Sequence, residues 1–395
     1  MRITEEHCAK NLAPPSRKAP APESGFAGFI DPLDERWAFM LKKTLHDFYH
    51  LPAYVSLAAE HETGQPAAFY AEQGDSSMLI PLLIRSLPPH LQAPRHWCDL
   101  ASPYGYPSPL YCPGADHISP DYFLREFGRS AADIDAVSGF FRLHPLIGLP
   151  WDSLDRQGKL VYHGETVYID LVMSDRDIWR NTRENHRDNI QRLREEGFEA
   201  VMDDWSRWSD FITLYHETMN RLKASSCYCF SDSYFDEFRF ALGFRLHLCT
   251  VIAPDGKVAA SGLVTVMDGL VQFHLAATAS PFLEKAPSKL MFDSVRQWAQ
   301  NRGERYLHLG GGVGGKKDSL FRFKAGFSKK RAEFHTFRMI FNQQRYDQLV
   351  MKCQQSDAEK AFGNDYFPAY RKKEEPFLAT PLSRGSQSSR ESSSG

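Results

Sequence analysis

The order of strands and helices after Asp177 most restricts how this chain can fold. Three apolar stretches are joined by Pro254-Asp255-Gly256 and Asp268-Gly269, which are turn signals of the kind that connect antiparallel strands. The spacing of apolar residues predicts the order β-α-α-β-β-β-α-β-α-β, behind a polar helical region. The predicted elements are the helical region Asp177–Glu196, the strand Phe198–Met202, the helices Ser206–Lys223 and Ser233–Gly243, the strands Arg245–Ala253, Val258–Val266 and Leu270–Thr278, the helix Ser288–Arg302, the strand Tyr306–Leu309, a glycine loop with a short helix, and the strand Phe334–Phe341.

The part of the chain before Asp170 has a looser pattern that also mixes strands with helices. Trp37, Met40, Leu41 and Leu45 recur at helical spacing and predict a helix over Asp34–Phe48. The other predicted elements are strands at Ala53–Ala59, Ala67–Ala71, Met78–Ile84 and His96–Leu100, a helix at Asp121–Arg129, a strand at Ala136–His144 and a strand that ends near Leu171. The pattern of predicted strands and helices divides into two halves between Asp170 and Asp175.

Length and composition are those of a globular protein with more than one domain. The chain has 395 residues, of which 42% are hydrophobic, and a formal net charge of −2. The start, MRITEEHCAK, lacks the apolar stretch of a signal peptide, and Asp268-Gly269 interrupts the longest weakly charged run, so we expect a cytoplasmic protein without membrane insertion. We expect a disordered segment 1–28, a first domain over 29–172, a second over 173–350, an extension over 351–375 and a disordered Ser-rich tail over 376–395.

The segment Arg305 to Arg331 concentrates positive charge in an otherwise nearly neutral chain. Seven Lys or Arg residues and one acid, Asp318, lie between Lys316 and Arg331. This local excess favours one anionic ligand over general attraction to DNA or membranes. A Walker A loop is disfavoured because Lys317 follows Lys316 where a Ser or Thr should hold magnesium, and a dinucleotide fold is disfavoured because too little chain follows. Two interpretations stay open: a phosphate-facing loop at a helix N-terminus, and a solvated turn.

Five short phrases, taken in order, resemble FemAB-like proteins. They are SPYGYPSPL at Ser102–Leu110, FFRLHPL at Phe140–Leu146, LHLGGG at Leu307–Gly312, DSLFRFKAGF at Asp318–Phe327 and FPAYR at Phe367–Arg371. FemAB-like proteins are tandem GNAT-fold acyltransferases related to the peptidoglycan aminoacyltransferases. The resemblance implies an α/β fold of two tandem GNAT-like domains, each a largely antiparallel twisted sheet with flanking helices. No direct sequence repeat between the two halves accompanies it.

The resemblance also implies an acyl donor bound where the sheet splays beside its fourth strand. Members that use acyl-CoA hold its pyrophosphate on a glycine-containing loop before the central helix, whereas residues 284–289 contain no glycine. Pro287 can still begin a helix there and leave the N–H groups of Ser288 and Lys289 for a phosphate. The peptidoglycan relatives use aminoacyl-tRNA instead. We therefore expect acyl-CoA or aminoacyl-tRNA as co-substrate, and no tightly bound cofactor.

Phe323 and Lys324 match the Phe-Lys pair that the peptidoglycan relatives use at the tRNA acceptor end. An aromatic ring can stack on a base, and an ammonium can face a developing oxyanion, so we predict both as catalytic residues. The opposing interpretation makes Phe323 a core residue and Lys324 a surface lysine. A metal site is not expected, because Cys227-Tyr228-Cys229 has no second paired motif.

Substrate contacts are predicted in both halves of the chain. The loop Ser102–Pro109 presents phenols for hydrogen bonds, and Arg142 interrupts an apolar strand, where an arginine needs an anionic partner; an internal salt bridge is the alternative. The predicted substrate-binding residues are Tyr104, Tyr106, Arg142, His144, Lys316, Lys317 and Arg322.

The expected activity is transfer of an acyl or aminoacyl group to an amine or hydroxyl of an anionic sugar or peptide precursor, in cell-envelope or polysaccharide biosynthesis. The alternative is a non-catalytic carbohydrate-assembly or tRNA-binding module that retains the GNAT fold. No general base stands out in the sequence.

Overall fold

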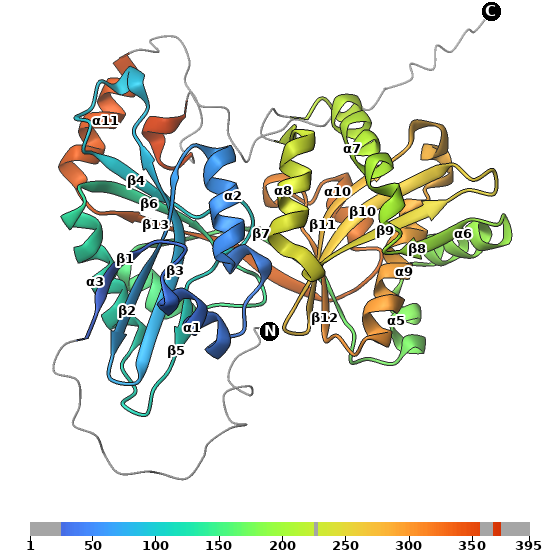
Figure 1. The fold of residues 1–395 in the computed structure, drawn as a ribbon, viewed down its shortest axis with the longest axis horizontal. Helices are drawn as coiled ribbons and strands as arrows, with labels where there is room; N and C mark the ends of the chain where they lie inside the picture. The colour runs from blue at the N-terminus through green and yellow to red at the C-terminus, as the bar shows by residue number, and fades with distance from the viewer. Residues whose placement is uncertain (1–24, 225–227, 356–365, 373–395) are drawn as a thin grey trace, which may run out of the picture.

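Two lobes share one continuous sheet in the computed structural model, which describes residues 25–224, 228–355 and 366–372 (Figure 1). Helices lie on both sides of this sheet, and α2 and α8 pack against each other where the lobes meet. None of the helices in the described ranges is long and apolar enough to cross a bilayer.

The two halves repeat one order of elements, although their sequences show no repeat. In each half a strand precedes two helices, three antiparallel strands, a crossover helix and a parallel strand. The first repeat consists of β1 (Ala27–Ile30), α1 (Glu35–Lys43), α2 (Pro52–Glu62), β2 (Gln65–Gln73), β3 (Ser76–Ser86), β4 (Cys98–Ala101), α3 (Pro120–Asp133) and β6 (Ala136–Arg142). The second consists of β8 (Glu199–Met202), α7 (Trp208–Leu222), α8 (Asp232–Leu242), β9 (Leu246–Ile252), β10 (Val258–Met267), β11 (Leu270–Thr278), α9 (Ser288–Asn301) and β12 (Tyr306–Gly310). The tandem arrangement of the predicted fold class is thus confirmed.

The remaining elements connect and extend these repeats. They are the 3₁₀ turn η1 (Phe48–His50), β5 (Leu110–Cys112), α4 (Trp151–Gln157), β7 (Lys159–Asp170), α5 (Asp175–Asn181), α6 (Glu184–Glu195), α10 (Ser319–Lys324), β13 (Arg331–Ile340) and α11 (Gln343–Gln355).

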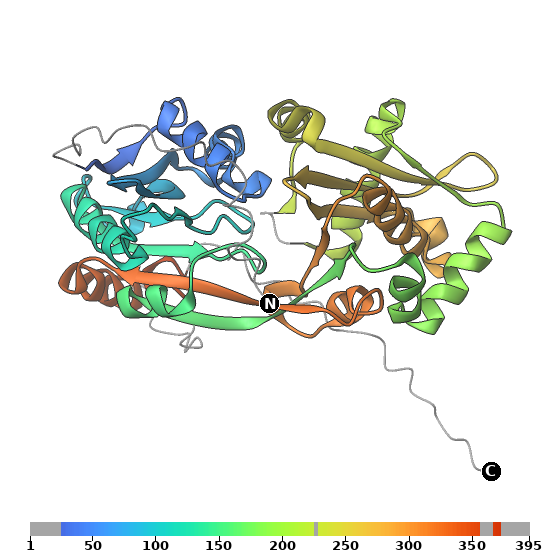
Figure 2. The same cartoon turned by 90° about the horizontal axis from the view of Figure 1, so that it is seen from below.

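The strand that follows each repeat, β7 after the first and β13 after the second, crosses into the other lobe. The sheet order is β1-β2-β3-β4-β6-β13-β7-β12-β11-β10-β9-β8, so β6 pairs with β13 and β12 pairs with β7. Figure 2 shows β7 in green and β13 in orange running together across the boundary between the lobes. Each lobe therefore contains one strand from the other half of the chain. The domain boundaries at 172 and 350 remain predictions.

The sheet splays inside the second lobe. The parallel pairing of β11 with β12 covers only three residue pairs and ends at Gln272 and His308, although β11 continues to Thr278. Beyond this point His274, Leu275 and Ala276 are partly exposed, although β11 is an interior strand. The exposure shows that β12 no longer covers this edge of β11.

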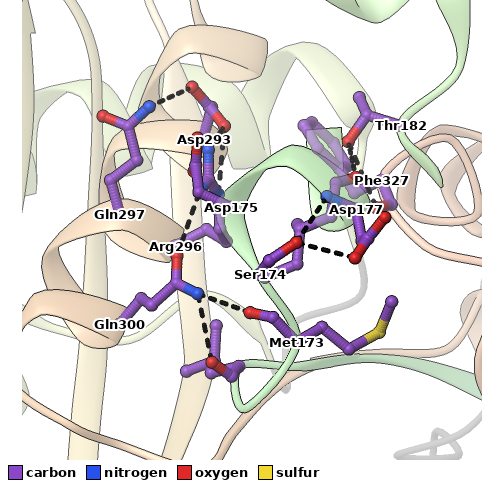
Figure 3. Close-up of polar contacts among 12 residues, drawn as sticks. Met173, Ser174, Asp175, Asp177, Thr182, Asp293, Arg296, Gln297, Gln300 and Phe327 are labelled. Atoms are coloured by element: carbon purple, nitrogen blue, oxygen red, sulfur yellow. Dashed lines mark hydrogen bonds and ion pairs between the residues drawn. The ribbon is translucent and has the colours of Figure 1, made fainter. Parts of the chain in front are cut away.

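A buried ionic network holds the segment between the halves, residues 171–175, against α9 (Figure 3). Arg296 on α9 pairs with Asp293 at 2.6 Å and with Asp175 at the start of α5, while Gln300 donates to the carbonyls of Leu171 (3.2 Å) and Met173 (2.8 Å). The Arg296 and Asp293 side chains are 2% and 4% exposed. Every polar group that Arg296 brings into the core is therefore matched by a partner from α9 or from this segment.

The FPAYR phrase anchors the C-terminal part of the described chain to the first lobe. Arg371 bonds both oxygens of the fully buried Asp99 on β4, at 2.5 and 3.1 Å, and Tyr370 donates to the same carboxylate at 3.1 Å. The phrase that supports the family resemblance here has a structural role.

Two predicted elements are wrong in detail. Ala53–Ala59 is not a strand but part of α2, which begins with Pro52 at its first turn and is buried on several sides by both lobes, so that its apolar residues show no helical stripe. The helical region Asp177–Glu196 is two helices, α5 and α6, which are separated at Thr182 and Arg183. Residues 1–24, Cys227 and the tail from Pro376 lie outside the described ranges, and Ala27 and Gly28 belong to β1.

Candidate functional site

The splay is marked by a hydrogen bond between two buried side chains. His308 Nδ1 lies 2.6 Å from Gln272 Oε1, and Gln272 Nε2 donates to the Phe273 carbonyl at 3.1 Å, which fixes the amide orientation. His308 therefore carries its proton on Nδ1 and a lone pair on Nε2. Nε2 is buried without a hydrogen-bond partner among the described residues, and burial lowers the pKa of His308, so the ring is neutral.

Lys324 lies next to this splay, at the end of α10. Its Nζ donates to the carbonyl of Gly311 at 2.8 Å, and the side chain keeps partial contact with solvent. Gly310 has φ +77°, and a Cβ there would lie 3.1 Å from Nζ, so glycine leaves room for the ammonium. Desolvation lowers the pKa of Lys324 to about 8, and Asp318 opposes this shift. The amine is a weakly solvated cation at neutral pH.

Asp318, the one acid between Lys316 and Arg331, connects the glycine loop to α10. Its carboxylate caps α10 by accepting from Phe321 N at 2.8 Å, and it also accepts from Val313 N at 2.9 Å. The glycine loop and α10 are thus fixed to each other, which positions Lys324 at the splay.

Tyr106 connects the loop of the first lobe to this site. Its ring lies 5.5 Å from the His308 ring and 5.9 Å from the His144 ring, and its hydroxyl lies 3.9 Å from the ideal Cβ position of Gly310. Tyr106 is partly exposed, and burial raises its pKa to about 12. The phenol therefore stays protonated and lies beside Lys324.

His144 is fully buried behind Tyr106, with both ring nitrogens in use. Nδ1 accepts from the N–H groups of Leu146 (3.0 Å) and Ile147 (3.1 Å), so the proton is on Nε2, which lies 3.2 Å from Asp47 Oδ2. These contacts join the start of η1 to the chain after β6. The arrangement positions Tyr106 and leaves His144 no nitrogen for a ligand in this conformation.

Tyr104, in the same loop as Tyr106, lies near Arg142 at the end of β6. Arg142 is buried, contacts the Ser102 carbonyl at 3.4 Å and lies 6.0 Å from the centre of the Tyr104 ring. Tyr104 is partly exposed, and Tyr54 and Glu62 of α2 bond its backbone.

The other predicted residues of the basic segment point elsewhere. Lys316 and Arg322 are exposed, and Lys317 pairs with Glu165 at 2.8 Å. Phe323 packs among Phe292, Phe327 and His186 with ring distances of 5.2 to 5.6 Å, on the core side of α10. The structure brings Lys324 and Tyr106 together, whereas Phe323 packs in the core and the other three predicted residues are exposed.

Ser288 and Lys289 begin α9, as predicted, without a side-chain cap. Lys289 contacts the Asn185 carbonyl at 3.3 Å, and desolvation together with Arg192 and Arg183 lowers its pKa. Burial, together with the positive charges of Lys289 and Arg183, lowers the pKa of His186 to about 4. Its Nδ1 is buried without a hydrogen-bond partner among the described residues. A helix N-terminus with clustered cations fits a phosphate of an acyl donor.

Sequence reasoning missed Gln272, His308 and Asp47. His308 carried a usable signal, because it is a polar residue between Leu307 and Leu309 in an apolar strand, as Arg142 is in its own strand. Asp47 carried none, since its contact with His144 spans 97 positions.

Comparisons with known proteins identify the fold. No protein-family model and no curated protein matches the sequence. Among solved structures, FemX matches with a TM-score of 0.60 and 13% identity over 81% of this chain and 98% of FemX. L-PGS from Bacillus licheniformis matches with a TM-score of 0.50 and 12% identity over 82% of this chain and 96% of that chain. A conserved protein of unknown function from Bacteroides thetaiotaomicron matches with a TM-score of 0.50 and 11% identity over 80% and 100%.

These similarities extend along nearly the whole described chain, and they agree with the internal repeat and with the five sequence phrases. At such identities they establish the architecture alone. The chain therefore has a FemX-like fold of two tandem GNAT-like units.

Proposed function

We propose that this protein is an acyltransferase that moves an acyl or aminoacyl group to an amine or hydroxyl of a cell-envelope or polysaccharide precursor. The observation that carries the proposal is the position of Lys324, whose ammonium is weakly solvated and lies at the splay of β11 and β12. In GNAT-type sites the reacting carbonyl lies in such a splay, where preorganised donors stabilise the oxyanion.

The chemistry assigned to these residues is electrostatic. The acceptor amine or hydroxyl attacks the donor carbonyl, the bond to the leaving oxygen or sulfur breaks, and the departing group or water takes the proton of the nucleophile. Lys324 faces the negative charge that develops on the carbonyl oxygen, and the phenol of Tyr106 lies close enough to Gly310 to line the same place. No single protein residue is required as the base in this scheme.

The donor is proposed to be acyl-CoA or aminoacyl-tRNA, both of which carry phosphates. Support comes from a cluster of cations at the start of α9: burial first, and then the nearby charges, lower the pKa values of Lys289 and His186. The charges are those of Arg192 and Arg183 for Lys289, and those of Lys289 and Arg183 for His186. An anionic group between them would relieve this repulsion. Lys316, Lys317 and Arg322 are proposed contacts for the anionic acceptor or the tRNA end.

The pH dependence of acyl transfer tests the proposal. Because the ammonium form of Lys324 is the active one, the rate should fall about tenfold per pH unit above a midpoint near pH 8. The measurement is kcat between pH 6 and 10 with acetyl-CoA or alanyl-tRNA and an amine acceptor. In Lys324→Ala this falling limb should be absent. Stoichiometric donor binding without any turnover would favour the non-catalytic module instead.

A further inference from the structure

Glu62 combines three conditions that each disfavour a carboxylate. It is the last residue of α2, where the helix dipole is negative, and it lies where α2 meets α8 of the other lobe. Burial raises its pKa although Arg142 and Arg85 act in the opposite direction. Within the described ranges it forms no salt bridge; Arg85 pairs with Asp99 instead, at 3.0 Å. A carboxylate in such an unfavourable environment is a candidate for ligand binding.

Only one carboxylate oxygen of Glu62 has a partner among the described residues. Oε1 accepts from the backbone N–H of Tyr104 at 2.7 Å, while Oε2 has no hydrogen bond, and the side chain is partly exposed. The free oxygen is therefore available to a ligand, with its companion held in place by a rigid backbone donor.

Aromatic rings from both lobes lie near Glu62. Tyr104 of the first lobe and Tyr228 of the second have ring centres 6.0 Å apart at an interplanar angle of 83°, and both are partly exposed. Beside them Tyr234 stacks on Phe230 at 4.2 Å, and both rings contact His61, the neighbour of Glu62. A carboxylate among aromatic faces is the environment that recognises substituted ammonium groups.

A purely structural role for Glu62 would require a hydrogen-bond acceptor at this position but not a negative charge. Tyr54 donates to the Tyr104 carbonyl at 2.8 Å, so α2 clamps the Tyr104 backbone from both sides. A neutral glutamine at position 62 would supply the acceptor for this clamp with a smaller desolvation free energy than a carboxylate. Arg142 and Arg85 offset part of the negative charge on Glu62, but within the described ranges neither forms an ion pair with it, and the clamp does not require the charge.

We propose that Glu62 and the rings of Tyr104, Tyr228 and Tyr234 form a subsite for a cationic amine. The subsite joins the loop that carries Tyr106, so under the proposed function its ligand is an ammonium group on the acyl acceptor. That assignment rests on the proposed function, whereas binding of the ammonium group does not require any transfer reaction.

The test compares Glu62→Gln, which keeps the acceptor for Tyr104 N–H, with Glu60→Gln, an exposed neighbour on α2. Calorimetric titration of the full chain with butylammonium chloride should show binding to the natural protein, and 1-butanol should bind far more weakly. Glu62→Gln should lose about tenfold or more in butylammonium affinity, since hydrogen bonds to charged groups are strong, and Glu60→Gln should lose none.

Stability separates this role from the clamp. Because the pKa of Glu62 is raised in the folded protein, its charge destabilises the fold above the ordinary glutamate pKa, so Glu62→Gln should melt at the same or a higher temperature near pH 7. Unchanged butylammonium binding in Glu62→Gln, or equal binding of butanol by the natural protein, would overturn the subsite. The titration contains no acyl donor, so its outcome is independent of whether Lys324 catalyses transfer.

Discussion

Replacement of Lys324 by alanine is expected to lower kcat for acyl transfer by about a hundredfold, as the loss of an oxyanion donor does in other acyl transfer sites. The amine lies at the splay and donates to the Gly311 carbonyl, so its removal takes away charge at the proposed position of the reacting carbonyl. Folding should be almost unaffected, because the desolvated ammonium costs stability in the folded state. The measurement is steady-state transfer together with thermal unfolding.

Lys329→Ala is the matched control for this variant. Lys329 is an exposed lysine of the same basic segment, so its loss changes the net charge equally without touching the splay. Its rate should remain within about twofold of the natural protein, because isolated surface charges act weakly through screened solvent. A Lys324→Ala enzyme with full activity would remove Lys324 from the mechanism.

The largest expected loss of stability comes from Arg296→Leu. This change removes one of the two arginines that pair with the buried Asp293, leaves it Arg194 at 2.8 Å, and frees Asp175 at the start of the second half, so the free energy of unfolding should fall by about 3 kcal/mol. Urea denaturation of the full chain measures it.

Arg180→Leu provides the comparison, because Arg180 on the nearby α5 is 67% exposed and, within the described ranges, forms an ion pair with Asp177 alone, at 3.0 Å. The cost there should stay within about 0.5 kcal/mol. The double variant Arg296→Leu with Asp293→Leu should recover part of the loss, since no unpaired buried charge remains. Equal unfolding energies for Arg296→Leu and Arg180→Leu would show that the network in Figure 3 does not hold the segment between the halves.

The sequence predicted most of the second half because its strands alternate and its turns are explicit. Asp268-Gly269 and Pro254-Asp255-Gly256 fall at the two hairpins, and Ser288 begins the crossover helix as expected. The helix α2 was mistaken for a strand because burial from two lobes erased its amphipathic period. The exchange of β7 and β13 was beyond prediction, since hydrogen-bond partners of strands far apart in sequence leave no local pattern.

The site was predictable where a residue belongs to a recognisable phrase. Lys324 and Tyr106 lie in two of the five phrases, and the structure places Nζ and the hydroxyl 3.1 and 3.9 Å from the position that a Cβ of Gly310 would take. Phe323 lies in the same phrase as Lys324, yet neighbouring residues of a short helix point to different sides, so it faces the core. Glu62 had no signal, because only the three-dimensional structure shows that no cation among the described residues forms a direct ion pair with it.

Donor protection of Lys324 from chemical labelling tests the central claim most directly. With a pKa of about 8, Lys324 is more reactive toward acetic anhydride at pH 8 than an ordinary lysine, and peptide mass spectrometry reads each lysine separately. Saturating CoA or alanyl-tRNA should protect Lys324 and leave the exposed Lys329 and Lys330 unchanged, and the protecting compound identifies the donor. Labelling of Lys324 that is the same with and without both donors would contradict the placement of the acyl donor at the splay of β11 and β12.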